Sequence, residues 1–123
     1  MADDPVLYSF VETPVFTRRL TELASFDTLA AIQADLLQAP ERWPVVRGTH
    51  GARKGRIADP LSGRGKSGSF RYLYLFLEHR GRIYLLFLFG KSEQANLTPA
   101  QTREVARLVD AIKEEADARE EEK

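Results

Sequence analysis

Apolar residues near the start of the chain change from a continuous run to a helical spacing. Val6–Val11 is rich in β-branched and aromatic residues and predicts a short buried strand. Thr13 and Pro14 then supply a capping hydroxyl and a proline at the first helical position. One apolar face follows at helical spacing: Phe16, Leu20 and Leu23. We therefore expect a strand that leads directly into a helix.

A second helical spacing begins after Ala24-Ser25, where the first pattern pauses. Its apolar stripe consists of Leu29, Ile32, Leu36 and Leu37. The residue before a proline is disfavoured in the helical conformation, so we expect this helix to end before Pro40. The two helices form a helical hairpin after the first strand.

From Trp43 onward the spacing is that of strands and loops. Pro44–Val46 and Arg53–Ala58 predict two short strands around a glycine-rich loop. Phe70–Glu78 and Arg82–Gly90 are longer, nearly continuous in apolar residues, and separated by a short polar turn. Such a pair predicts a hairpin in a sheet whose central part is covered.

A last helix is predicted from Thr98–Gln101, which has the pattern of a capping box with proline at the first helical position. Its apolar stripe is Val105, Leu108, Val109 and Ile112. Residues 114–123 are acidic and lack large apolar side chains, so we expect a frayed helical end or a disordered tail there. The expected organisation is one domain over residues 1–113 and an acidic tail over 114–123.

The element order β-α-α-β-β-β-α predicts an α+β fold, with helices packed on a small, mainly antiparallel sheet. A chain of 123 residues has room for one core. The acidic N-terminus lacks the features of a signal peptide, and no apolar run approaches the ~20 residues of a membrane-spanning helix. The absence of cysteine excludes disulfides and thiolate zinc sites. We expect a cytoplasmic protein without a membrane partner.

The net charge of zero conceals a strong segregation of charge. Residues 47–91 carry ten basic and two acidic residues, whereas the segments on either side carry an excess of four acidic residues each. So many cations repel one another unless a polyanion is the partner. The central segment therefore predicts binding of nucleic acid or phosphate.

Basic residues also follow the strand alternation. Lys54 and Arg56 lie on one face of the predicted strand, Arg53 lies on the other, and Arg71 of the next strand can join the first face. The glycine-rich segment Gly63–Gly68 contains Arg64 and Lys66. A strand rather than a helix follows this segment, which excludes a dinucleotide fingerprint and a P-loop. Its exposed amides and cations remain suited to a phosphate.

The aromatic residues of the long strands, the histidines and the serines add no candidate to the site. The aromatic residues of the two long strands are expected in the core rather than as a platform for bases. His50 and His79 have no further ligand at metal-binding spacing, so both are expected at the surface and no metal site is proposed. No serine has the surroundings of a hydrolase nucleophile.

Three segments, Gly51–Arg56, Gly63–Tyr72 and Tyr84–Glu93 with the following Asn96-Leu97, resemble the HigB branch of the RelE toxin superfamily. The likeness extends to Val11–Phe16 and to the helix around Gln33–Leu36. The resemblance implies a RelE-like fold and a ribosome-dependent mRNA endonuclease, the toxin of a type II toxin–antitoxin pair. It also implies a cognate antitoxin with a helix-turn-helix domain, and cleavage without a metal or other cofactor.

The resemblance also implies the site. It places Arg53, Lys54 and Arg56 on the first basic strand of the family site and Arg64 and Lys66 in its glycine loop. It places Arg71 at the phosphate-facing position and Lys91 on the last strand. Cleavage through the 2′-hydroxyl requires a base, cations around the phosphorus and an acid, which Lys and Arg can supply if the site lowers the pKa of a lysine. We assign Lys54 as base, Arg71 and Arg64 as phosphate clamps, and Lys91 as proton donor or second clamp.

One position departs from the family. Close relatives carry Tyr where this chain has Phe89, so no phenol can act there. Two other classes of function remain open: a noncatalytic module that binds RNA or the ribosome, and an inactivated toxin that only binds an antitoxin. Cleavage and salt-dependent binding distinguish the three classes.

Overall fold

The order of secondary structure is the predicted β-α-α-β-β-β-α. The computed structural model describes residues 7–61, 68–93 and 96–121. Within these ranges the elements are β1 (Ser9–Glu12), α1 (Pro14–Leu23), α2 (Phe26–Gln38), β2 (Arg53–Ala58), β3 (Ser69–Leu77), β4 (Arg82–Phe89) and α3 (Pro99–Glu121). The predicted α+β class is therefore confirmed.

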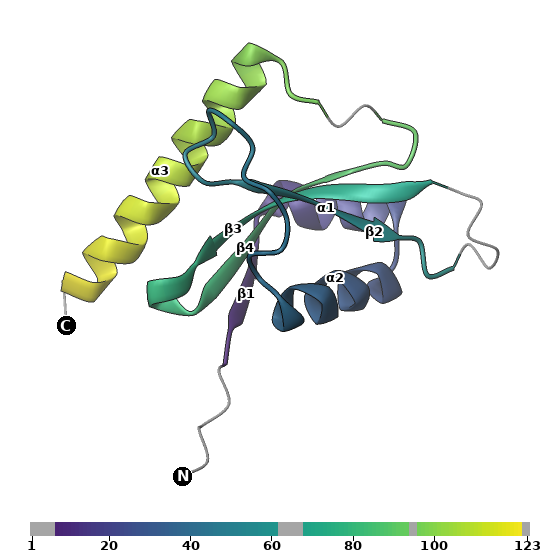
Figure 1. Ribbon diagram of the computed structural model, residues 1–123, viewed down its shortest axis with the longest axis horizontal. Helices are drawn as coiled ribbons and strands as arrows, with labels where there is room; N and C mark the ends of the chain where they lie inside the picture. Colours follow the sequence, from purple (N-terminus) through teal and green to yellow (C-terminus); the bar gives the residue numbers. More distant parts are fainter. Residues whose placement is uncertain (1–6, 62–67, 94–95, 122–123) are drawn as a thin grey trace, which may run out of the picture.

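The strands form one sheet in the order β1-β4-β3-β2. β1 runs parallel to β4, and the other two pairings are antiparallel. Figure 1 shows α3 on one side of the sheet and α1 and α2 on the other. The sheet is thus mainly antiparallel, as predicted, with one parallel edge strand.

Short elements differ from the sequence prediction. The first strand starts at Ser9 rather than Val6, which lies outside the described residues. Instead of a strand at Pro44–Val46 there is a single bridge between Val45 and Arg53. These segments are too short for periodicity alone to fix their pairing.

Thr13 joins α1 to the sheet. Its hydroxyl accepts a hydrogen bond from the backbone N–H of Phe16 at 3.1 Å, as predicted for the N-cap, and donates one to the carbonyl of Leu86 at 2.8 Å. Leu86 is the extra residue of a bulge, because Leu73 pairs with Phe87 and Tyr74 with Leu85. The cap therefore also satisfies a carbonyl at the bulge.

The larger core lies between the sheet and the helices α1 and α2. Its helical side chains include Phe16, Leu20, Ile32 and Leu36, and its sheet side chains include Phe70, Tyr72, Tyr74, Ile83, Leu85 and Leu88. The prediction that Leu23 and Leu37 belong to the buried stripes is wrong: they are 40% and 49% exposed. Buried Thr28 lies inside instead, since it is one turn from Ile32.

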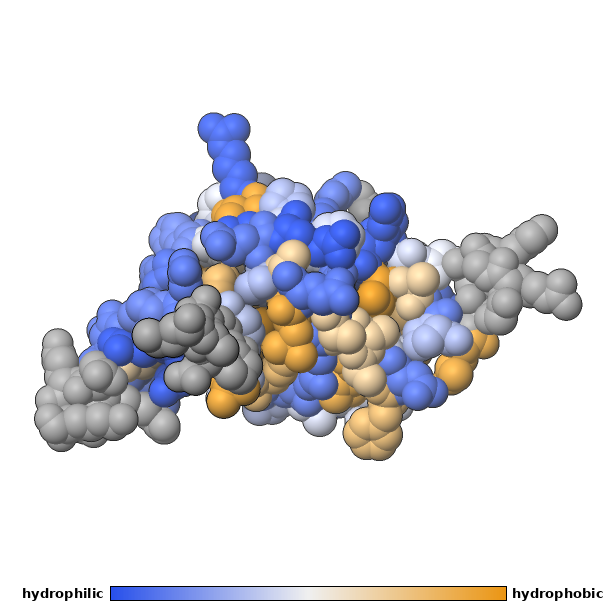
Figure 2. Space-filling model, turned by 60° about the horizontal axis from the view of Figure 1, so that its bottom comes forward, coloured by the Kyte–Doolittle hydropathy of each residue, from blue (hydrophilic) through white to orange (hydrophobic). Residues whose placement is uncertain are grey.

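Part of the helical surface is apolar and exposed. Phe26, at the start of α2, is 85% exposed, and Leu23 precedes it at the end of α1. Figure 2, which turns the lower side of Figure 1 toward the viewer, shows hydrophobic side chains across its lower middle and hydrophilic ones above and to the left. Apolar side chains are therefore exposed where α1 ends and α2 begins.

The second core lies under α3. Val109 and Ala116 of α3 are buried against Leu73, Leu75 and Leu86 of the sheet. The predicted capping box is confirmed: Thr98 N–H donates to the Gln101 side chain at 2.9 Å, and Gln101 N–H donates to the Thr98 hydroxyl at 3.1 Å. Within the described ranges, no helix is long and apolar enough to cross a membrane.

Over residues 114–121 the structure differs from the expected tail. α3 continues to Glu121, Ala116 is buried, and Asp117 accepts a hydrogen bond from Arg80 at 2.9 Å. A small residue suffices where the helix lies close to the sheet, so the absence of large apolar side chains did not end the helix. Contacts with the β3–β4 turn stabilise this part of α3.

The ion pair at Asp117 gives a prediction about acid stability. The hydrogen bond from Arg80, and secondarily His79, lowers the pKa of Asp117 below its usual range. A carboxyl with a lowered folded-state pKa stabilises the fold above its unfolded pKa of about 3.9, and that stabilisation is lost as pH falls through the folded-state value. We expect chemical denaturation to show a smaller loss of stability below about pH 4 for Asp117→Asn than for the parent, with Glu114→Gln behaving like the parent.

Candidate nucleic-acid interface

Three predicted site residues share one face of the sheet. Arg56 of β2 lies directly opposite Arg71 of β3, and Lys54 lies opposite Leu73. Since side chains alternate along a strand, Lys54, Arg56 and Arg71 point to the same side, which is the side of Leu73 and α3. We call these three residues the basic triad. Cross-strand partners of this kind have Cβ atoms roughly 5 Å apart.

The two arginines of the triad have no charged partner in the described part of the chain. Arg56 is exposed and Arg71 is half-buried, and neither forms a hydrogen bond or ion pair with a described residue. The Lys54 ammonium lies 3.5 Å from the side-chain oxygen of Asn96, which carries no charge. Like charges directly opposite in a sheet are destabilising, so this arrangement favours a bound anion.

Asn96 was not predicted as a site residue. The Asn96-Leu97 pair belongs to the sequence resemblance, but the sequence alone gives no reason for an amide near Lys54. Only the return of the chain from β4 to α3 brings it there. Its amide can also donate to a phosphate oxygen.

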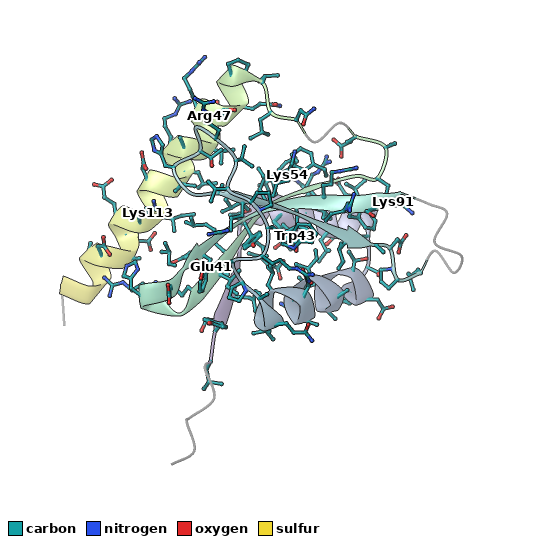
Figure 3. The ribbon with its side chains drawn as sticks, in the orientation of Figure 1. Glu41, Trp43, Arg47, Lys54, Lys91 and Lys113 are labelled. Carbon is teal, nitrogen blue, oxygen red and sulfur yellow. The ribbon has the colours of Figure 1, made fainter. Side chains whose placement is uncertain are left out.

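Arg53 lies on the opposite face, as the alternation predicted. Its guanidinium donates to the carbonyls of Glu41 and Trp43, at 3.0 and 2.7 Å. Figure 3 shows Glu41 and Trp43 on the connection between α2 and β2. This geometry favours a structural role for Arg53, which fixes that connection, over direct contact with RNA.

Lys91 lies apart from the triad. Figure 3 shows it at the end of the sheet, whereas Lys54 lies near the centre. The Lys91 ammonium is 2.8 Å from a carboxylate oxygen of Asp59 and 5.5 Å from the ring centroid of Phe70. The hydrogen bond from Lys91, followed by the backbone N–H of Leu61, lowers the pKa of Asp59. Lys91 must leave Asp59 before it can serve a phosphate.

Arg64 and Lys66 lie outside the described residues.

Arg19 is a residue that sequence reasoning missed. It donates to the Leu88 carbonyl at 2.8 Å, forms an ion pair with Glu93, and lies 4.8 Å from the ring centroid of Phe87. Glu93 in turn accepts from the Gly90 N–H. Arg19 therefore holds the segment on either side of Lys91.

The tyrosines of β3 belong to the core, as predicted. Tyr72 and Tyr74 are fully buried, and Tyr74 donates to the Pro40 carbonyl at 2.8 Å. Burial is the main cause that raises the pKa of both phenols, that of Tyr74 to about 12. Both phenols stay protonated and away from the basic triad.

Both histidines are exposed and lie near carboxylates of α3. His50 Nδ1 is 3.0 Å from Asp110, and His79 Nε2 is 3.5 Å from Asp117. Among the residues that the structure describes, no group of three or more His, Cys, Asp or Glu side chains could hold a metal ion.

No protein-family model matches the sequence. Among solved structures, the chain is similar to the E. coli toxin RelE, a doubly substituted variant in the free state. The similarity has a TM-score of 0.52 at 14% sequence identity and covers 70% of this chain and 85% of RelE. The chain therefore has a RelE-like fold.

Proposed function

We propose that this protein is a ribosome-dependent mRNA endonuclease, the toxin of a type II toxin–antitoxin pair that a cognate helix-turn-helix antitoxin neutralises. The observation that carries the proposal is the basic triad: Lys54, Arg56 and Arg71 share one sheet face, and the two arginines have no carboxylate partner among the described residues. The RelE-like fold and the resemblance in sequence support it.

The proposed chemistry needs no metal. Lys54 takes the proton of the RNA 2′-hydroxyl, and the 2′-oxygen forms a bond to phosphorus while the bond to the 5′-oxygen breaks. Arg71, together with Arg64, stabilises the negative charge that develops on the phosphoryl oxygens. Lys91, once separated from Asp59, protonates the leaving 5′-oxygen or serves as a second clamp. Arg56 and Lys66 bind flanking phosphates.

The proposal is tested with purified protein, ribosomes and a defined message. We expect cleavage of the message on the ribosome and much less cleavage of the same RNA alone. Growth arrest on expression, reversed by a neighbouring gene for a helix-turn-helix protein, is the expected result in cells. Binding that falls steeply with salt but leaves the message intact would indicate a noncatalytic module. An intact message without RNA or ribosome binding, but with antitoxin binding, would indicate an inactivated toxin.

The Asp59–Lys91 pair gives a further prediction. Asp59→Asn removes the carboxylate that competes with RNA phosphate for Lys91. We expect tighter binding of a short RNA at low salt, by a few-fold, because an ion pair at a partly exposed site contributes little. Fluorescence polarisation measures the change in affinity for the RNA. Asp27→Asn, which removes an exposed carboxylate of α2, serves as the matched control. Equal affinities of Asp59→Asn and the parent would contradict the role of Lys91.

A further inference from the structure

A cavity lies beside the basic triad. It is a groove of about 310 Å³ between α3 and the sheet, near the lower end of the size range of ligand pockets. Its floor consists of Leu73, Leu86, Phe87 and Phe89, and Leu97 and Val105 form part of its wall. The floor is mostly apolar and includes two aromatic rings.

The bulge in β4 creates this floor. Because Leu86 is the extra residue, Leu86, Phe87 and Phe89 all lie on the α3 side of the sheet. A regular strand would turn one of the two adjacent residues, Leu86 or Phe87, to the other face. The rings of Phe87 and Phe89 meet edge to face, with centroids 4.8 Å apart.

The groove and the triad are continuous. Phe89 lies directly opposite Arg71, and Leu73 lies between its partners Lys54 on β2 and Phe87 on β4. An RNA strand whose phosphate lies on Arg71 and Lys54 therefore has the groove directly beside it. A ligand that joins an anion to a flat apolar group matches this surface.

Two polar side chains of α3 line the groove. Gln101 uses its side-chain oxygen to cap the helix, which leaves its amide N–H groups to donate. Glu104 is exposed, so its carboxylate is accessible as an acceptor, although it also lies 3.6 Å from the Arg107 guanidinium. The groove thus offers apolar walls and a rim that can both donate and accept. Single-stranded RNA is recognised in this way, by aromatic contact with a base and hydrogen bonds to its edge.

We propose that this groove binds one nucleobase of the RNA whose phosphate lies on the basic triad, and that Gln101 and Glu104 select the base. The inference rests on the proposed function and names a subsite of the same interface. The base enters between α3 and β4, and the apolar floor desolvates its faces. Val105 stands at the wall, so a larger side chain at this position fills the groove.

The test uses messages that carry one abasic nucleotide at successive positions around the cleavage site, on ribosomes, with the full-length protein. We expect one position at which loss of the base lowers cleavage by about 5- to 100-fold, the range expected for one stacked base. Val105→Trp should abolish this dependence on position. Glu104→Gln, which keeps the fold, should change the preferred base at that position, and Glu114→Gln on the same helix should not.

Each contrary outcome has a distinct meaning. Cleavage that is insensitive to an abasic nucleotide at every position would overturn the base subsite and leave the proposed endonuclease intact. Failure of the parent protein to cleave any message would overturn both. A Val105→Trp variant that keeps its dependence on one base but no longer binds an antitoxin would assign the groove to a protein partner instead.

Discussion

Lys54→Ala should reduce the rate of message cleavage on ribosomes by about 10²–10⁴-fold, the typical contribution of a general base. Arg71→Ala should reduce it by about 10²–10³-fold, because a cation aimed at the developing charge is lost. Both side chains lie on the surface that faces α3 and neither fills the core, so the fold should remain intact. Single-turnover cleavage with saturating ribosomes measures the chemical step.

The control for these variants is Arg103→Ala, which removes an exposed cation of α3 outside the triad and the groove. It should cleave like the parent. Lys54→Arg keeps the charge but removes a group that can act as a base, since arginine stays protonated in proteins. Parent-like cleavage by Lys54→Arg would exclude Lys54 as the base, and parent-like cleavage by Arg71→Ala would exclude the clamp.

Gly55→Ala should destabilise the protein by about 1–3 kcal/mol or more, as overpacking of a rigid core does. A Cβ atom at Gly55 would lie 2.6 Å from the phenol oxygen of Tyr72 and 2.8 Å from one of its ring carbons. Tyr72 is fully buried beneath β2 and cannot move away without displacing its neighbours. Denaturation with urea measures the difference in the free energy of unfolding.

Gly68→Ala is the matched control for this change. A Cβ atom at Gly68 would lie 3.6 Å from the Lys91 carbonyl, which is an ordinary contact. Its stability should stay within about 0.5 kcal/mol of the parent. If Gly55→Ala were equally harmless, the close approach of β2 to Tyr72 would not be a constraint on the fold. Because Gly55 lies between Lys54 and Arg56, loss of this approach should also displace the triad.

The caps show how much local structure is predictable. Thr13-Pro14 and Thr98–Gln101 started helices where the sequence indicated, because a cap depends only on residues within one turn. The predictions were wrong where the local structure depends on a segment that is distant in the sequence. The extent of α3 beyond residue 113 depends on Arg80 and on the space above the sheet, which the local sequence does not show.

The candidate site likewise has one part that the local sequence predicts and another part that only the fold determines. Strand alternation placed Lys54 and Arg56 on one face and Arg53 on the other, and the segregation of charge indicated an anionic partner. Alternation has a fixed period of two, so it needs no tertiary information. The commitment of Lys91 to Asp59 and the approach of Asn96 to Lys54 involve residues 32 and 42 positions apart in sequence, and only the fold brings them together.

The sequence by itself determined the order of elements, the helix starts and the concentration of cations in the centre of the chain, because each follows from neighbouring residues. The tertiary structure decided the register that sets Arg56 opposite Arg71, the bulge at Leu86 and the groove under α3. Register and bulges depend on how two strands pack against the same helices. The physical reason is that burial is shared among segments far apart in the chain.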